Sequence, residues 1–425
     1  MTLAGLSIAY LRDRALHTAL NIGLLALAVA TMTVLALLSA QLGQRFERDA
    51  RGVDLVVGAK GSPLQLILSA IYHVDVPTGN IPLETVEMLR QDPTVGEVIP
   101  LALGDSFRGF RIVGTEPSYI AHHGGRLAEG RRWGAPFEAV LGSEVAARTG
   151  AKVGQKFVGS HGLAAEGGSG HDEHPFVTVG VLEPTGTVID RLILTSVESV
   201  WDVHGVAHGE DAAHHADGDE HEHDHRHEEA AAAPNASTAV HGGEPEVTAL
   251  LVKYRSPLAA VRLPNFINRQ TALQAAAPAV EITRLLSLVG VGLEAVRAFA
   301  GLLMLTGALS IFVALYTALR QREADMAMLR VMGARPKAIF GQVILEGLLL
   351  SAAGAAIGLA LGHAAVAIAA RSFGQLRDLG LSAARFEPAE AWIVAAALTL
   401  GVLAALIPAL KVFRVDIADT LAHAR

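Results

Sequence analysis

The sequence predicts an α-helical membrane protein with four transmembrane helices and a large mixed α/β domain inserted between the first and second helices. The mean hydropathy is +0.38. Only 18% of the 425 residues are charged, whereas soluble globular proteins have about 25%. Four apolar runs also reach the roughly 20 helical residues that cross a bilayer. Together these observations favour a bilayer environment for a large part of the chain.

The four apolar runs predict transmembrane helices over residues 19–42, 298–319, 339–370 and 389–410. Four buried core helices of a soluble protein are the alternative, but such helices usually carry a polar stripe, which these runs do not. The first run could also be a secretory signal peptide, since Leu38-Ser39-Ala40 resembles a cleavage site. Its apolar region exceeds the roughly 7–15 residues of such peptides, so we interpret it as a retained anchor.

Basic residues near the predicted helices indicate the orientation, because cytoplasmic loops carry an excess of Lys and Arg. They gather in the N-terminal segment 1–18, in the loop 320–337 and in the tail 411–425, which we therefore expect in the cytoplasm. The large domain 43–294 and the loop 371–388 then lie on the outer side. That side also carries some bases near the helices, so the bias is moderate.

Alternating apolar stretches and turn residues predict a mixed α/β fold for the large outer domain. The alternation predicts strands over residues 51–58, 107–113, 176–181, 191–195 and 247–254. Helical spacing predicts helices over 81–91 and 143–149, and a stalk helix over 273–296 that leads into the second transmembrane helix.

The formal net charge of −8 comes from one short stretch. Nine acids and one base lie between His204 and Glu229, so this stretch alone carries the whole charge and the rest of the chain is neutral. The absence of a broad basic face argues against nucleic acid as a partner. The sequence contains no cysteine, which excludes disulfides, thiolate zinc sites and a cysteine nucleophile.

Histidine alternates with charged residues inside an insertion over 204–243 that we expect to be disordered. In an extended chain, side chains at i and i+2 share a side and can converge on one ion. Neutral imidazole suits zinc, copper or nickel. The alternative is a solvated low-complexity insertion with incidental metal affinity, and the pair His122-His123 is a weaker candidate. The predicted metal ligands, with Zn²⁺ as the expected ion, are His214, His215, His221, His223, His225 and His227.

Two ionisable residues interrupt the third apolar run, Glu346 and His363. A charged group in the hydrocarbon is costly and suggests a function. We interpret Glu346 as an interfacial or helix-packing carboxylate, and His363 as a packing residue in preference to one that faces a dimer seam. Glycines in the same run favour close helix contact; they are Gly347, Gly354, Gly358 and Gly362.

Several motifs resemble those of the FtsX/MacB-type permeases of ABC transporters. The loop after the second apolar run reads RQRE over 320–323 and MLRVMGA over 328–334, and Ile407-Pro408-Ala409 ends the fourth run. The outer domain contributes LAEGR over 127–131 and VLG over 140–142. The resemblance covers most of the chain and includes the position of the large outer domain after the first helix.

The resemblance implies a non-catalytic type VII transmembrane subunit of the bacterial inner membrane with a MacB-like periplasmic domain. It implies that a separate ABC ATPase subunit binds ATP and that a second permease subunit completes a homo- or heterodimer. The other expected partners are a periplasmic protein or lipoprotein and the membrane lipid. In keeping with this, the sequence has no G-x-x-x-x-G-K-[ST] phosphate-binding motif, since GAKVGQK over 150–156 has the wrong spacing.

The loop 320–337 is the expected contact with the ATPase. Its residues predict a short charged helix over 319–331 with Met326, Met328 and Leu329 as apolar contacts, and Met adapts readily to a partner surface. The positive charge of the loop could instead serve only as a topology signal, and the resemblance favours docking. The residues expected to couple the chain to the ATPase are Arg320, Arg322, Glu323, Met328, Leu329, Arg330 and Gly333.

The function predicted from these features is that of a permease subunit that couples ATP hydrolysis in a partner to motion of a periplasmic domain, and so to export or extraction of a substrate. A regulatory membrane scaffold that controls a periplasmic enzyme or binding protein without transporting cargo is the alternative. A secondary transporter fits poorly, because four helices and a large outer domain show no inverted repeat. The histidine tract adds the hypothesis of a link to zinc handling.

Overall fold

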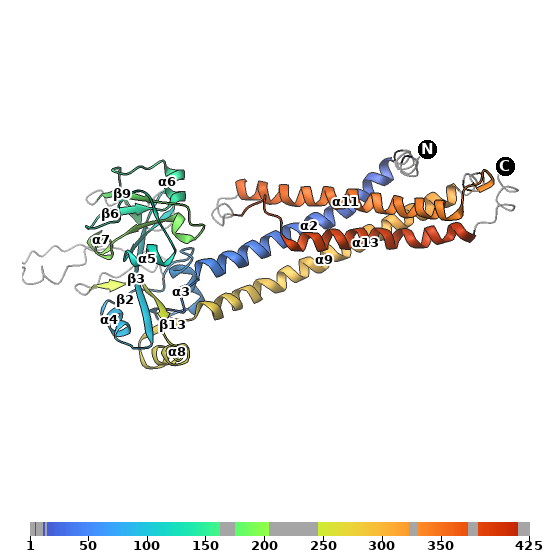
Figure 1. Ribbon diagram of the computed structural model, residues 1–425. Coiled ribbons are helices and arrows are strands. Elements are labelled where there is room, and N and C mark those ends of the chain that lie inside the picture. The colour runs from blue at the N-terminus through green and yellow to red at the C-terminus, as the bar shows by residue number, and fades with distance from the viewer. Residues whose placement is uncertain are drawn as a thin grey trace, which may run out of the picture. The chain divides into compact units, whose positions relative to one another are not determined.

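The computed structural model describes residues 15–161, 175–203, 245–322, 330–372 and 381–414, together with Gly5, Arg12, Met326 and Met328. The chain divides into two compact units, a helical unit of residues 1–44 and 287–425 and an α/β unit of residues 45–286 (Figure 1). This division confirms the predicted fold class of a helical membrane protein with a mixed α/β domain after its first transmembrane helix.

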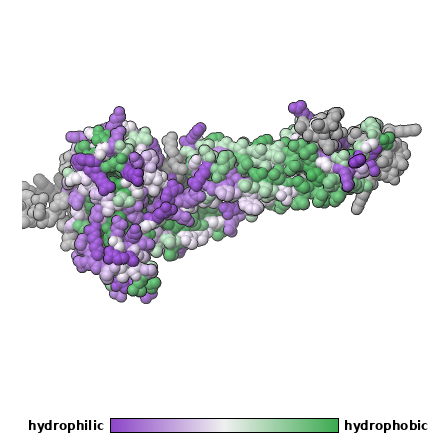
Figure 2. Space-filling model, in the orientation of Figure 1, coloured by the Kyte–Doolittle hydropathy of each residue, from purple (hydrophilic) through white to green (hydrophobic). Residues whose placement is uncertain are grey.

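Within the described residues, four long helices are apolar enough to cross a membrane. They are α2 (Ala15–Asp49), α9 (Pro278–Gln321), α11 (Pro336–Ser372) and α13 (Pro388–Lys411), and the 3₁₀ turn η3 (Val412–Arg414) follows α13. Each helix contains one of the predicted apolar runs and extends beyond it. Hydrophobic side chains cover the middle of the helical unit (Figure 2), as a surface that meets hydrocarbon requires.

Glycines allow α11 to pack closely against α2 and α13. A Cβ atom at Gly358 would lie 2.6 Å from Cβ of Val29 on α2, and one at Gly347 would lie 2.6 Å from Cβ of Ala405 on α13. Such close approach is how small residues support association of transmembrane helices. The glycine spacing of the third apolar run therefore reflects packing within the chain.

Local signals explain where α11 and α13 begin. Gly333 has φ +99°, a left-handed conformation that glycine adopts without steric cost, and Pro336 then opens α11 at a position where its missing N–H is harmless. Glu387 precedes α13 and forms a capping box with Glu390, so the first backbone N–H groups of the helix are satisfied.

In the part of the α/β unit that the structure describes, eleven strands form one mixed sheet. Its strands are β1 (Leu55–Ala59), β3 (Val95–Phe107), β4 (Phe110–Thr115), β5 (Leu127–Gly130), β6 (Glu138–Leu141), β7 (Lys156–Phe157), β8 (Ser160–His161), β9 (Phe176–Leu182), β10 (Leu192–Thr195), β12 (Ala249–Tyr254) and β13 (Leu273–Ala276). The order is β13-β1-β12-β3-β4-β10-β6-β9-β5, with β7 paired to β9 and β8 to β3. The pairs β4–β10 and β6–β9 are parallel. A separate two-stranded sheet pairs β2 (Ile81–Pro82) with β11 (Glu246–Val247).

Short helices cover both faces of the large sheet (Figure 1). They are α3 (Pro63–Ala70), α4 (Glu84–Arg90), α5 (Ser118–His122), α6 (Ser143–Thr149), α7 (Val197–Val203) and α8 (Ala259–Gln270), with a 3₁₀ turn η1 (Val188–Arg191). Because side chains alternate along a strand, Val56 of β1 enters one core with Ile67 of α3. Its neighbours Leu55 and Val57 enter a second core with Leu263 of α8.

The strand predicted over 107–113 is two strands joined by a tight turn. Strand β3 ends at Phe107 and β4 begins at Phe110. Between them Arg108 and Gly109 both have positive φ, 50° and 80°, as a type I′ hairpin turn requires. The apolar alternation runs through this turn and conceals it.

The expected stalk helix over 273–296 is wrong at its start, and the helix expected over 81–91 is shorter. Residues Leu273–Ala276 form β13, which pairs antiparallel with β1, and α9 begins only at Pro278. Strand β2 takes Ile81–Pro82, and α4 covers Glu84–Arg90. In both places the strand exists because a distant strand offers hydrogen bonds, which a short local pattern cannot show.

Candidate functional site

The segment between α9 and α11 exposes three apolar side chains on one face. Met328, Val331 and Met332 are all exposed, and their spacing of three and four residues places them on one face of a helical turn. The contact residues predicted from the sequence did not include Val331 and Met332. Their exposure identifies them, and this exposure depends on the phase of the helix, which the sequence pattern does not fix.

Met326 does not belong to that exposed face, which corrects its expected role as a partner contact. It is buried against Leu319 of α9, Ile339 and Val343 of α11, and Val412. The helix expected over 319–331 is also interrupted. Helix α9 ends at Gln321, and the N–H of Arg322 donates to the carbonyl of Leu319 in a tight turn. Glu323 and Leu329 lie outside the described residues.

The basic residues at the inner end of the helices share an aromatic contact. The guanidinium of Arg320 lies 5.4 Å from the centre of the Tyr316 ring, and Nζ of Lys411 lies 4.7 Å from the same ring. Lys411 also donates a hydrogen bond of 3.3 Å to the Tyr316 hydroxyl. These contacts hold the end of α9 beside the end of α13. Arg330 is half-buried and Gly333 ends the segment with positive φ.

Glu346 lies buried on α11, where Gln342 donates a hydrogen bond of 3.4 Å to its carboxylate. It lines a cavity with residues of α2 and α9, so it faces the interior of the helical unit. This placement fits the interpretation of Glu346 as a carboxylate within the helix packing, and it adds a cavity that the sequence did not reveal.

His363 of α11 contacts both the start of α13 and the segment just before it. Its Nδ1 lies 2.6 Å from the carbonyl of Ala383, and its Nε2 lies 3.0 Å from the carboxylate of Glu390. The ring also lies 4.7 Å from the ring of Phe386. Both ring nitrogens therefore face acceptors of the same chain, which is a structural contact and matches the packing interpretation.

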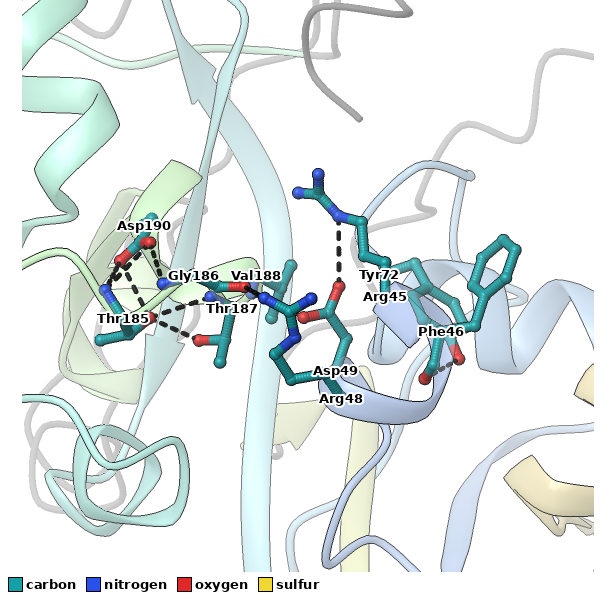
Figure 3. A network of polar contacts seen from close by, with 10 residues as sticks. All are labelled: Arg45, Phe46, Arg48, Asp49, Tyr72, Thr185, Gly186, Thr187, Val188 and Asp190. Atoms are coloured by element: carbon teal, nitrogen blue, oxygen red, sulfur yellow. Dashed lines mark hydrogen bonds and ion pairs between the residues drawn. The ribbon is translucent and has the colours of Figure 1, made fainter. Parts of the chain in front are cut away.

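A polar network holds the last turn of α2 in the α/β unit (Figure 3). The buried carboxylate of Asp49 accepts a hydrogen bond of 3.0 Å from the N–H of Val188 and lies 3.7 Å from the guanidinium of Arg45. Burial raises the pKa of Asp49, and the nearby Arg45 and Arg191 partly offset this effect. The hydroxyl of Tyr72 donates a hydrogen bond of 3.0 Å to the carbonyl of Phe46 in the same turn.

The partner of this turn is the loop that leads into η1. Asp190 accepts hydrogen bonds from the N–H groups of Thr185 and Gly186, at 2.9 and 2.7 Å. The guanidinium of Arg48 donates a hydrogen bond of 2.9 Å to the carbonyl of Gly186 (Figure 3). The loop is thus closed on itself and joined to α2. In the sequence, Arg45 and Arg48 appear only as basic residues near a predicted transmembrane helix. No local motif indicates a role for Asp49 or Asp190.

The predicted metal ligands of the histidine tract all lie outside the described residues. Among the residues that the structure describes, no group of three or more His, Asp or Glu side chains could hold a metal ion. His123 packs edge-on against Tyr119 at 4.7 Å, with His122 5.1 Å away. Burial, with a smaller contribution from His122, lowers the pKa of His123 to about 3, so this pair is part of the domain packing.

Models of two known protein families match the chain, one in each of its two units. A model of the FtsX-like permease C-terminal region matches residues 297–417, and a model of the MacB-like periplasmic core domain matches residues 18–218. No curated protein matches the chain.

Two solved structures are similar to part of the chain. The periplasmic region of MacB from Actinobacillus actinomycetemcomitans is 12% identical with a TM-score of 0.33, and the match covers 57% of this chain and 98% of that one. The extracellular domain of the noncanonic ABC-type transporter YknZ from Gram-positive bacteria is 13% identical with a TM-score of 0.29, covering 52% and 98%.

The order of the two family models along the chain agrees with the observed architecture. The MacB-like model covers the first long helix and the following α/β domain, and the FtsX-like model covers the three remaining long helices. The chain belongs to the FtsX/MacB-type permeases of ABC transporters, which are multi-pass inner-membrane proteins with a large periplasmic domain.

Proposed function

We propose that this transmembrane subunit transmits ATP-driven motion from a cytoplasmic ATPase partner to its periplasmic domain, and that this motion exports or extracts a substrate. The observation that carries the proposal is the continuity of two helices. Helix α2 has 35 residues and α9 has 44, about 52 and 66 Å at 1.5 Å per residue. Both exceed the roughly 30 Å of hydrocarbon in a bilayer.

Proline is the commonest cause of a sharp kink in a helix, and the interiors of α2 and α9 contain no proline. Both helices continue through the boundaries between the two units, at residues 44–45 and 286–287. A displacement at the inner end of such a helix therefore moves its outer end.

The inner end offers a surface on which an ATPase can dock. Met328, Val331 and Met332 expose an apolar face, and Arg320 adds positive charge nearby in the chain. Flexible Met side chains suit adaptable contacts, and Arg is favoured for pairing with carboxylates of a partner. We assign to this segment the contact with the ATPase, in place of Met326.

The outer end of α2 is joined to the domain firmly enough to pass motion on. Asp49 and Arg48 contact the segment 186–188 at the start of η1, and Phe46 contacts Tyr72, through the bonds described above. Because these bonds come from one helical turn, rotation or translation of that turn displaces the loop before η1 directly.

Recovery of the partner from native membranes tests this proposal. The full-length tagged chain should co-purify with a nucleotide-hydrolysing subunit. Val331→Glu, which places a charge in the apolar face, should reduce the recovered ATPase at least tenfold. Val261→Glu on α8 is the matched control, because Val261 is 68% exposed and Val331 is 65% exposed, yet Val261 lies in the periplasmic domain. Equal recovery with both variants would refute the assigned docking surface, and the absence of any ATPase would refute the proposed coupling.

We further propose that the histidine tract binds zinc and links the permease to metal handling. The alternation of His221, His223, His225 and His227 with acids and one arginine favours this role. Calorimetric titration of the full chain with Zn²⁺ should show sites that disappear when residues 207–233 are deleted. Unchanged affinity and stoichiometry after the deletion would reject the tract as the binding site.

A further inference from the structure

One face of α9 is exposed along most of the helix and follows a heptad spacing. From Leu288 to Val313, exposed positions recur at alternating steps of four and three residues. This alternation is the spacing of the a and d positions of a coiled coil. We call these positions the α9 seam; they are Leu288, Gly292, Ala295, Phe299, Leu302, Thr306, Leu309 and Val313.

The opposite face of α9 packs inside the helical unit. Its buried side chains include Met304, Ile311 and Leu315, which share a core with Leu25 of α2. With Phe299 at position a of the heptad, these three residues take positions f, f and c, which lie away from the a and d positions. The helix therefore has one face for its own chain, while the seam stays exposed in the described part of the chain.

The seam is too long for lipid alone to cover it. From residue 288 to residue 313 it rises about 38 Å at 1.5 Å per residue, whereas the hydrocarbon of a bilayer is about 30 Å thick. Counted outward from Arg320 at the inner end of the helix, about 30 Å of helix ends near Ala300. The seam residues from Leu288 to Ala295 therefore lie beyond the acyl chains.

This outer part of the seam is apolar although it lies outside the hydrocarbon. Val289, Val291 and Val296 flank it and are exposed as well. Gly292 and Ala295 are small residues of the kind that lets two helix backbones approach closely. A contiguous exposed apolar surface marks an interaction site, so a protein surface is needed to cover this part of α9.

The composition of the seam fits a second copy of the same helix. Copies of one membrane chain insert with the same orientation, which the basic residues set, so two α9 helices meet in parallel. In a symmetric parallel pair each a or d residue faces its own counterpart, and a charged residue there would meet a like charge. None of the seam residues is charged. The hydroxyl of Thr306 donates a hydrogen bond of 2.6 Å to the carbonyl of Leu302 in its own helix, so it needs no acceptor across the seam.

We propose that the α9 seam is the contact between two copies of this chain, with the two α9 helices parallel and in register about a twofold axis. Leu288, Phe299 and Leu302 then each pack against their counterparts in the second copy. The family resemblance implies a homo- or heterodimer without a contact surface, and the seam makes the pair a homodimer and assigns the surface. The contact does not depend on the proposed coupling to an ATPase.

Cysteine crosslinking in native membranes tests the proposal, because the chain contains no native cysteine. Two copies of the full chain with different tags are expressed together, and the membranes are treated with a mild oxidant without added nucleotide. Ala295→Cys, at a d position, should form a disulfide-linked dimer that carries both tags. A disulfide needs Cα atoms within about 7 Å of each other. Glu294→Cys is the matched control, since it is exposed one residue away but off the seam, and should give at most a tenth of this dimer.

A second pair of variants measures the strength of the contact. Leu288→Glu places like charges opposite each other and should raise the dissociation constant of the dimer at least tenfold, measured by analytical ultracentrifugation of the full chain in detergent. Val280→Glu is the matched control and should leave the constant unchanged, because Val280 is 62% exposed and Leu288 is 67% exposed, yet Val280 lies off the seam of the same helix. Thermal unfolding of each variant confirms that it is folded.

Three outcomes would overturn the proposal. The first is equal crosslinking, or none, in Ala295→Cys and Glu294→Cys. The second is a crosslinked product of Ala295→Cys that contains a different polypeptide in place of the second tag, which would show another subunit at the seam. The third is an unchanged dissociation constant in Leu288→Glu. Recovery of the ATPase is measured separately with Val331→Glu, so the dimer contact and the coupling function fail separately.

Discussion

The carboxylate of Asp49, the last residue of α2, accepts a hydrogen bond of 3.0 Å from the backbone N–H of Val188, 139 residues further along the chain. This bond joins the end of the first long helix to the first residue of η1 in the periplasmic domain. A carboxylate at the C-terminus of a helix is unfavourable for the helix dipole. The acceptor role and the neighbouring Arg45 explain why an acid is nevertheless tolerated there.

Replacing Asp49 should weaken the junction in proportion to the hydrogen bond that is lost. Asp49→Ala leaves the buried N–H of Val188 without an acceptor and should cost about 1–3 kcal/mol of domain stability. Asp49→Asn retains an oxygen acceptor and should cost less, because burial already raises the pKa of the carboxyl. Thermal unfolding of the full-length chain measures both variants. Identical stability of the alanine variant and the wild type would contradict this view of the junction.

The periplasmic domain should lose stability in mild acid. The pKa of His123 is lowered to about 3 in the fold, whereas an unfolded histidine has a pKa of about 6.5. Folding therefore excludes a proton: the stability that His123 contributes is complete above pH 6.5 and falls as the pH drops towards 3. Between pH 7 and pH 5 the loss is up to about 2 kcal/mol. Burial likewise keeps the pKa of His73 well below its ordinary value, with the same sign.

The variant His123→Phe tests this pH dependence, because it preserves an edge-on ring against Tyr119 and removes the titrating group. Unfolding measured at pH 7 and pH 5 should show a smaller acid-induced loss in the variant than in the wild type. If both proteins lose the same stability, His123 does not titrate in the way that its surroundings predict.

Close packing between α2 and α11 should make Gly358 intolerant of a side chain. A Cβ there would lie 2.6 Å from Val29 Cβ and 2.7 Å from the carbonyl oxygen of Ala26. Gly358→Ala should cost about 1–3 kcal/mol, measured by thermal unfolding in detergent. Gly23→Ala is the control, since a Cβ at Gly23 meets nothing within 4 Å. Equal stability of the two variants would show that α2 and α11 separate easily.

Hydropathy predicts the four transmembrane helices because their signal is local and long. The same local reasoning fails where pairing across the chain decides the structure. Leu273–Ala276 become strand β13 because β1 offers an edge, and β3 and β4 separate at Arg108-Gly109, a pair that is not a usual turn signal. Neither feature can be inferred from a window of neighbouring residues.

The candidate sites show the same limit. The basic and apolar character of the coupling segment is visible in the sequence, but the face that it exposes depends on the helix phase. The sequence therefore predicts Met326 as a contact and does not single out Val331 and Met332. Asp49 and Asp190 have no sequence motif, because their partners come from a distant loop or from backbone groups. The histidine tract is conspicuous in the sequence and stays a prediction.

Distance measurement between the two units tests the central claim most directly. The chain contains no native cysteine, so Val153→Cys in the periplasmic domain and Ala384→Cys in the loop before α13 can carry spin labels at exposed positions. In the complex with its ATPase, addition of ATP should shift the distance distribution. Val291→Pro should abolish the shift while the ATPase stays bound, because proline interrupts the hydrogen bonding of α9, and Val291→Ala should preserve it. The same ATP-dependent shift in Val291→Pro, or no shift in the wild type during ATP hydrolysis, would contradict transmission through these helices.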